Sequence, residues 1–436
     1  MKTDQEIKDH PWTLDEIEKE VKDVYLIVDE GIIAVVIATV VSNRIKSQAS
    51  PVWLLLMSGS SAGKSIMTNL ISKCGDWIIP VDTLTTNTFA SSMKRDTEVS
   101  LLHKAKNGVL VFKDFTIIAN MNEEGFREIM GQLRGIFDGS FNKYSGNDAD
   151  VAWTGKIGCL AAGTIEVQRR MRDFSKNGER FLNYIINVAD YKEMAKRAMR
   201  NQATIKEKEE YLQKIVAAFV NQIITTMLIK DIFISNEIED EMINVANFCT
   251  LARSPVVMSK KDPRLVEFVG DREAPSRMAM MLKNLAVSLL LIQSKETLDD
   301  KNARILYKIG LDSIPVERRL CLKVLSEYRN SNTQSIAVKL HYPTETVLAW
   351  LNQLHALKLV DKIKEGNSFV WQIHEEHRAI MVKYLELKVV DAQLSIEDEY
   401  DTDNVYTKEQ QQKLNEDVMS LDMGYDDVAQ VGFDNF

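Results

Sequence analysis

Cysteine is scarce in this sequence, and none of it occurs in a short paired motif. The four cysteines of the 436-residue chain stand far apart, and no two of them form a Cys-x-x-Cys pair. This spacing argues against a zinc site and against a disulfide framework, and it suits a reducing compartment.

The sequence also lacks a secretion signal and a long apolar run. Its first residues, MKTDQEIKDHPW, do not place a basic stretch before an apolar one. The most apolar run, Ile32 to Val41, has ten residues, which is too short to span a bilayer and predicts a buried helix. We therefore expect a cytoplasmic protein without a membrane partner.

Positive charge is scarce near the end of the chain. Residues 395–436 hold twelve acidic residues against two lysines, a balance of −10, whereas the whole chain carries −9. The preceding 394 residues therefore carry about +1, so the acidic total does not argue against nucleic-acid binding. With few large apolar residues, this acidic tail is predicted to be disordered.

Short apolar runs alternate with helical patterns up to about residue 195. Strands are expected at 51–58, 77–81, 108–112 and 156–163, which predicts an α/β fold with a parallel sheet sandwiched by helices. Three short helices and a hairpin within 316–373 predict a winged helix. The expected units are an N-terminal helical segment (1–48), the sheet core (49–195), a helical lid (196–310), the winged helix (311–376), and a helical extension with the acidic tail (377–436).

A loop of small residues between a strand and a helix carries the strongest chemical signal. Its backbone N–H groups can curl around a phosphate, and the helix that follows adds a positive dipole. Lys64 can reach the β- and γ-phosphates of ATP, and the Ser65 hydroxyl can bind Mg²⁺. Ser58 stands where this pattern usually begins with glycine. The predicted phosphate-binding residues are Ser58, Gly59, Ser60, Ser61, Ala62, Gly63, Lys64 and Ser65.

A carboxylate at the end of another apolar strand is expected to complete the site. In GVLVFKDF this residue is Asp114, which could hold Mg²⁺ through water or orient the attacking water. Lys113 occupies the position where many such ATPases have a first carboxylate.

Three basic residues are further candidates by position. Arg180, in NGERFLNYI, is expected after the last strand of the sheet, and Arg277, in APSRMAMML, opens a helix of the lid. Lys143 lies near the polar tip of a predicted hairpin between Phe137 and Ile157, where it could contact phosphate or simply be a solvated turn lysine.

The motifs and their order along the chain resemble those of the AAA+ ATPases of phages and other mobile elements. These ATPases are related to MCM-like replicative helicases. The resemblance covers roughly residues 25–373 and rests on SNRI, SPVWLLLMSGSSAGKS, VFKDFTII, LRGIFDGSF, GKIGCLAAGT, NGERF and APSR. It implies a ring of identical subunits, most commonly a hexamer, with ATP between subunits and single-stranded DNA in a central channel. The expected setting is the cytoplasm of a bacterium or of a phage-infected host cell.

The resemblance also assigns roles. Lys64 and Ser65 become the Walker A contacts, Asp114 the Walker B acid, and Thr164 the sensor at the end of its strand. Arg180 becomes the finger that acts on a neighbouring subunit and Arg277 the second sensor, and Lys143 lies on the hairpin that grips DNA.

Three functions remain open at this point. The first is an ATP-driven helicase or translocase in replication; the second is an initiator or helicase loader; the third is a DNA-binding assembly protein with little ATP turnover. Three residues depart from the family pattern: Ser58 replaces a glycine, Lys113 an acid and Thr164 an asparagine. Ser58 and Lys113 keep the third function open. The final GYDDVAQVGFDNF resembles the tails of single-strand-binding proteins, and it could dock on a replication protein, compete with DNA, or only add solubility.

Overall fold

The structure is a computed structural model. It describes residues 2–59, 63–89, 101–105, 107–144, 151–173, 179–187, 191–226, 234–366 and 368–385. Ser60, Ser61 and Ala62 of the phosphate-binding loop lie outside these ranges, as does the predicted acidic tail.

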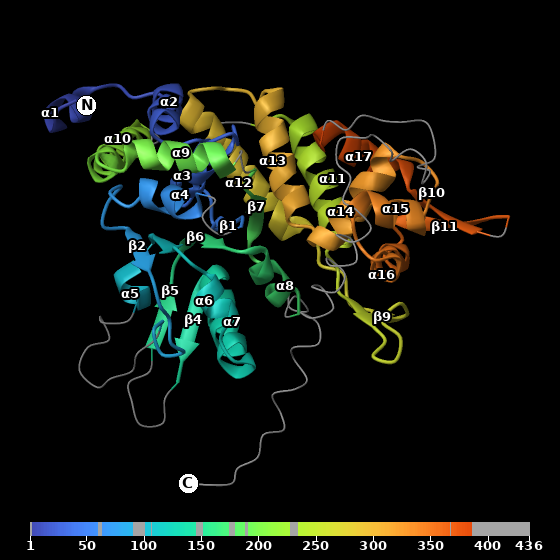
Figure 1. Ribbon diagram of the computed structural model, residues 1–436. Helices are drawn as coiled ribbons and strands as arrows, with labels where there is room; N and C mark the ends of the chain where they lie inside the picture. Colours follow the sequence, from blue (N-terminus) through green and yellow to red (C-terminus); the bar gives the residue numbers. More distant parts are fainter. Residues whose placement is uncertain are drawn as a thin grey trace, which may run out of the picture.

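A five-stranded parallel sheet forms the centre of the molecule, which confirms the predicted α/β core (Figure 1). Its strand order is β2-β3-β6-β1-β7. The strands are β1 (Trp53–Met57), β2 (Ile78–Val81), β3 (Val109–Phe112), β6 (Gly158–Gly163) and β7 (Leu182–Ile185). Every residue of β1, β3 and β6 is buried, because helices cover both faces of a parallel sheet, and this explains their uninterrupted apolar sequences.

Helices lie on both sides of this sheet. Figure 1 shows α3 (Ile32–Ser42) and α4 (Lys64–Leu70) on one side, and α6 (Thr116–Ala119), α7 (Glu123–Phe137) and α8 (Ile165–Asp173) on the other. All residues of α3 are buried, as its apolar sequence predicted. The short α5 (Leu101–Ala105) precedes β3, and a separate hairpin of β4 (Ser140–Lys143) and β5 (Val151–Thr154) follows α7.

Asn43, in the SNRI sequence, joins the end of α3 to the start of β1. Its side-chain amide donates to the Val52 carbonyl (3.1 Å), and its side-chain oxygen accepts from the Val52 N–H (3.0 Å). A Cβ at Gly158 would lie 2.3 Å from the Asn43 side chain, so only glycine allows this approach. The two residues therefore fix where β1 enters the sheet.

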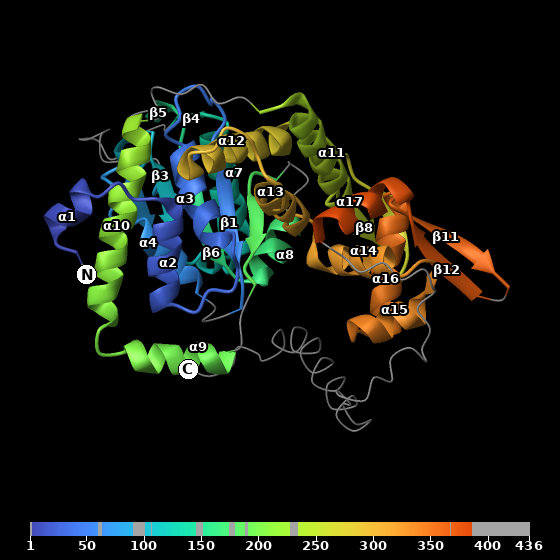
Figure 2. The same cartoon turned by 90° about the horizontal axis from the view of Figure 1, so that it is seen from above.

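The N-terminal helices pack against a long helix that follows the sheet. Thr13 caps α2 (Leu14–Val24) by a reciprocal capping box with Glu16. The other helices of this group are α1 (Asp4–Asp9), α9 (Tyr191–Asn201) and α10 (Ile205–Thr226). Figure 2 shows α10 alongside α1, α2 and α4, and the contacts between these elements agree.

The predicted lid, residues 196–310, is not wholly helical. Its later helices are α11 (Asn236–Ala252), α12 (Ser276–Gln293) and α13 (Asp300–Asp312), but a hairpin of β8 (Val256–Met258) and β9 (Val266–Val269) interrupts them. Helix α12 packs on α3 and α13 packs on β7, so these helices form part of the same core as the sheet.

The C-terminal part contains three helices and a small antiparallel sheet. The elements are α14 (Val316–Glu327), β10 (Ser331–Asn332), α15 (Thr333–Leu340), α16 (Thr344–Ala356), β11 (Val360–Glu365), β12 (Ser368–Ile373) and α17 (Glu375–Leu385). The sheet order is β10-β12-β11. Within the described ranges, no helix combines the length and the hydropathy needed to cross a membrane.

Candidate functional site

The predicted phosphate-binding loop joins the buried strand β1 to helix α4. Of its predicted residues, the structure describes Ser58, Gly59, Gly63, Lys64 and Ser65. Gly63 has a left-handed backbone with a φ of 88°, which glycine adopts without steric cost, and it directly precedes the helix.

The ammonium group of Lys64 turns back over the loop. It donates to the Gly59 carbonyl (2.7 Å), to the Ser58 carbonyl (2.9 Å) and to the Ser58 hydroxyl (3.2 Å). Partial burial lowers the pKa of Lys64, and the nearby carboxylates of Asp114 and Glu166 oppose this change. The cation is therefore held beside the loop and within the field of two acids.

Asp114 and Thr164 come to the same edge of the sheet as this loop. In the strand order β6 lies between β1 and β3, and all three strands are parallel. Two hydrogen bonds join their carboxyl ends: the Ser58 N–H donates to Gly163 (3.4 Å), and the Phe115 N–H donates to Ala162 (2.6 Å). The strand order thus brings together three residues that are distant in the sequence.

The Asp114 carboxylate has a fixed orientation at the surface of this edge. Its Oδ1 accepts the backbone N–H of Thr116 at 2.9 Å. Lys113 instead reaches toward the end of β2, where its ammonium lies 3.9 Å from the Asp82 carboxylate. Both partners of that ion pair are exposed, so the pair contributes little to stability.

Glu166 is a further member of the site that sequence reasoning missed. The Thr164 side chain donates a hydrogen bond to it, which is the main reason that the pKa of Glu166 is lowered; the charge of Lys64 acts in the same direction. Glu166 is therefore a carboxylate near neutral pH, and it lies in the first turn of α8. The signal in the sequence was Thr-x-Glu directly after an apolar strand.

Arg180 lies at the opposite edge of the sheet, where the parallel strands begin. The prediction that it follows the last strand was wrong. It precedes the last strand, because β7 follows it and pairs with β1. Its guanidinium donates to Asp138 at 3.1 Å. Burial lowers the pKa of Arg180, and the charge of Arg277 lowers it further.

Arg277 shares this second cluster. At the start of α12 it donates to Glu273 (3.0 Å) and to the Glu179 carbonyl (3.4 Å), next to Arg180 in the chain. Arg253 contacts the same Glu273 at 2.6 Å. The structure thus brings the two predicted arginines together, but not to Lys64 of the same chain.

Lys143 is the last residue of β4, on the side of the hairpin where the chain leads on to β5. Its ammonium donates to the side chain of Asn87 at 2.8 Å. Residues 145–150, which connect the two strands, lie outside the described ranges.

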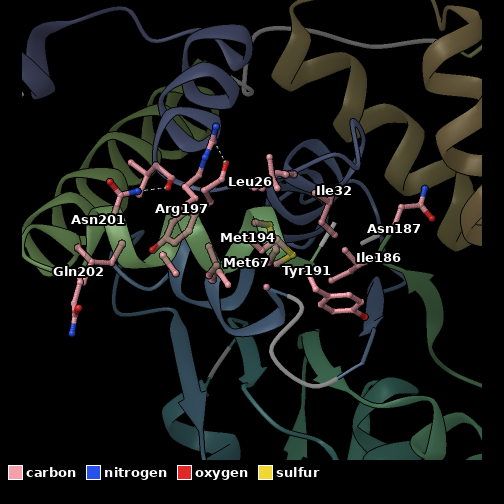
Figure 3. A pocket seen from close by; sticks show the side chains of 18 residues that line it. Leu26, Ile32, Met67, Ile186, Asn187, Tyr191, Met194, Arg197, Asn201 and Gln202 are labelled. Carbon is pink, nitrogen blue, oxygen red and sulfur yellow. Dashed lines mark hydrogen bonds between the residues drawn. The ribbon is translucent and has the colours of Figure 1, made fainter. Parts of the chain in front are cut away.

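An apolar cavity of about 520 Å³ opens beside the phosphate-binding loop (Figure 3). Gly63, Ile66 and Met67 form its wall on the side of α4. The remaining walls come from residues 24–27, Ile32, residues 186–187 and the helical stretch 191–205. Its volume and apolar lining are typical of pockets for small organic ligands.

Three hydrogen bonds hold the far wall of this cavity in place. Arg197, on α9, donates to the carbonyls of Lys22 (2.7 Å) and Tyr25 (3.0 Å). Asn201 donates to the Val24 carbonyl at 2.7 Å. The carboxyl end of α2 is therefore fixed to α9, and both line the cavity opposite the start of α4.

Lys64 and the carboxylates at the sheet edge suit phosphates and their metal ion, and the cavity beside them suits a flat apolar ring. Hydroxyl and carboxylate oxygens, as on Ser65 and Asp114, are the ligands that Mg²⁺ prefers, so this donor set suits a magnesium nucleotide. A scan against protein-family models and a search of curated proteins found no match to this sequence.

Proposed function

We propose that this chain is an ATPase of the AAA+ type that acts as a DNA helicase or translocase in the replication of a phage or mobile element. The observation that carries the proposal is the grouping of Lys64, Asp114, Thr164 and Glu166 at one sheet edge beside the apolar cavity. A cation, two carboxylates and a hydroxyl around one loop are what phosphoryl transfer to water requires.

In this proposal each part of ATP has a matching place. The loop and Lys64 bind the β- and γ-phosphates, and the adenine enters the cavity against Ile66 and Met67. Ser65 and Asp114 would hold Mg²⁺, which would supply positive charge against the phosphates. Asp114 or Glu166 would orient the attacking water, because both carboxylates belong to the group around Lys64 at this sheet edge.

The position of the arginines supports a ring of subunits. Arg180 and Arg277 lie together at the sheet edge opposite Lys64, so they do not reach the phosphates bound by their own chain. In a head-to-tail ring, one edge of a subunit meets the other edge of its neighbour. Both arginines then stabilise charge on the neighbour's triphosphate, which makes hydrolysis depend on assembly.

Two other parts fit a DNA motor. The β4–β5 hairpin with Lys143 extends from the sheet domain on the side of α7, and we assign it to the DNA channel. The order α14, β10, α15, α16, β11, β12 is that of a winged helix, which we assign to the C-terminal part.

An assembly protein with slow ATP turnover is the competing function. The position of Lys113 favours it, because a lysine follows β3 where a second carboxylate would assist hydrolysis. Glu166 weakens the case for slow turnover, because it supplies a second carboxylate near Lys64 from the end of another strand.

Measurements of ATP binding, phosphate release and strand displacement test the proposal. Lys64→Ala should lose nucleotide binding and both activities. Lys73→Ala is the matched control, because Lys73 is an exposed lysine paired with Glu210 at 3.1 Å and lies outside the site. Equal binding and phosphate release by the two variants would show that the proposal is wrong. Phosphate release that DNA stimulates, without any strand displacement, would instead indicate a loader.

A further inference from the structure

The β11–β12 hairpin has two chemically different faces. In its antiparallel register Lys362 pairs with Trp371 and Lys364 pairs with Phe369. Directly opposed residues point to the same side of a sheet, so these four side chains share one face. The alternate residues of β11, Asp361, Ile363 and Glu365, belong to the other face. One face is therefore basic and aromatic, and the other carries acidic and aliphatic residues.

The basic-aromatic face, defined as Lys362, Lys364, Phe369 and Trp371, has a rigid base and an open outer end. Trp371 is fully buried, and its ring N–H donates to the Thr333 hydroxyl at 2.9 Å. Phe369, further out, is 47% exposed. The Lys362 ammonium lies 4.7 Å from the Phe369 ring centre and 5.1 Å from that of Trp371. Figure 2 shows the hairpin projecting from the rest of the molecule.

Helix α16, by contrast, offers little to a polyanion. Its sequence, TETVLAWLNQLHA, contains no lysine or arginine. Arg264, at the β8–β9 hairpin, forms an ion pair with Glu345 in its first turn (3.1 Å). Asn352, two turns further on, donates to the Arg264 carbonyl (2.8 Å). The neighbouring hairpin thus already contacts this helix at two positions.

We propose that the basic-aromatic face binds single-stranded DNA, with Lys362 and Lys364 at phosphates and a base stacked on Phe369. An exposed aromatic ring beside lysines is the combination that binds unpaired bases, whereas a duplex hides its base faces and would use the charges alone. This inference rests on the proposed DNA-dependent function and identifies a binding surface outside the channel hairpin. The hairpin, not α16, is then the part of the C-terminal module that contacts DNA.

Fluorescence anisotropy of the full chain with labelled oligo-dT, measured across a salt series, tests the two contributions separately. Each phosphate contact on a single strand contributes about 0.7 to the slope of log affinity against log salt, so Lys362→Ala with Lys364→Ala should lower the slope by about 1.4. Phe369→Ala should weaken binding roughly 10-fold at constant slope, and Phe369→Trp should retain it.

Two control variants make the result specific. Ile363→Ala changes the opposite face of the same hairpin, and Lys295→Ala with Lys301→Ala removes two positive charges from the end of α12 and the start of α13. Both should bind like the wild type. Ultraviolet cross-linking of the oligonucleotide should also label a peptide that contains residues 360–373.

The outcomes also separate this inference from the proposed function. A wild-type chain that binds oligo-dT and hydrolyses ATP, with hairpin variants that bind equally well, overturns the inference and leaves the motor intact. An equal loss in the Lys295 and Lys301 control shows a general charge effect and also overturns it. A wild-type chain that hydrolyses ATP but binds no DNA overturns both the inference and the helicase.

Discussion

Mixing two inactive variants should restore ATP hydrolysis if each triphosphate is served by two subunits. Lys64→Ala removes the phosphate contact of the loop, and Arg180→Ala removes the arginine at the opposite sheet edge. In a head-to-tail ring, each site combines the loop of one subunit with the arginine of the next. A site formed by the loop of an Arg180→Ala chain and the arginine of a Lys64→Ala chain is therefore intact.

The register of the sheet gives the distance on which this prediction depends. Leu182 pairs with Leu54, so Arg180 is level with Val52, while β1 ends at Met57. Five residues at ~3.3 Å each separate these levels by about 17 Å along the strand. An arginine finger contributes about 10³- to 10⁵-fold to turnover, so Arg180→Ala alone should be nearly inactive.

Phosphate release from equimolar mixtures is the assay. Random assembly leaves about one site in four intact, so the mixture should recover about a quarter of the wild-type rate, whereas either variant alone stays near background. A mixture of Lys64→Ala with Asp114→Asn is the control, because both changes affect the same site and no intact combination exists. If mixed rings form and only the sum of the single-variant rates is seen, the assignment of Arg180 to the neighbour's site is refuted.

Three further predictions concern single sites. Asp114→Asn should keep nucleotide binding, because it leaves the loop unchanged. It should lower the hydrolysis rate at least about 100-fold in a phosphate-release assay, because it removes the negative charge proposed to hold Mg²⁺ or orient the attacking water. Ala195→Trp should fill part of the cavity and weaken nucleotide binding in a titration, whereas Ala195→Ser should not. Burial lowers the pKa of His377 in the folded chain below its ordinary 6.5, so the unfolded chain binds more protons as pH falls through that value. Stability should therefore decline from pH 6.5 down to the folded pKa, and His377→Gln should reduce that decline in urea unfolding if the protonation of His377 causes it.

The sheet could be predicted from the sequence where burial is complete. Strands β1, β3 and β6 are buried along their whole length, so their apolar runs and the flanking loops located them. Asp114 and Thr164 could be predicted as site residues because each follows such a run. For parallel strands, the carboxyl ends are at one edge whatever the strand order.

Strand β7 could not be predicted in the same way, because it is short and two of its four residues are polar, with partners far away in the sequence. It has only four residues, Leu182–Ile185, and includes Asn183 and Tyr184. The Tyr184 hydroxyl donates to Asp29, and the Asn183 N–H donates to Ser313 at 3.1 Å. These acceptors come from segments more than 100 residues away, so the local sequence showed no sign of a strand, and Arg180 was expected after the last strand of the sheet.

The cavity was unpredictable for a related reason. Its walls come from the end of α2 and the residues after it, from α3, α4, α9 and α10, and from the residues after β7. Apart from Gly63 in the predicted phosphate-binding loop, none of these walls has a motif of its own. The β8–β9 hairpin was missed because its strands are short, none of their residues is fully buried, and they lie between two strongly helical sequences. Glu166 needed the strand order as well, since only the position of β6 beside β1 brings it to Lys64.

Strand β7 connects the two halves of the proposed site. Its amino end follows Arg180, and its carboxyl end leads to Ile186 and Asn187, which line the cavity. The Ile186 N–H donates to Met57 at 2.8 Å, directly before the phosphate-binding loop, and the Asn187 N–H donates to Asp29 at 3.0 Å. Backbone bonds therefore connect β7 to β1 and to the residue directly before the predicted phosphate-binding loop. In the proposed ring, contact of Arg180 with a neighbour's triphosphate would therefore act on the nucleotide pocket of its own subunit through this strand.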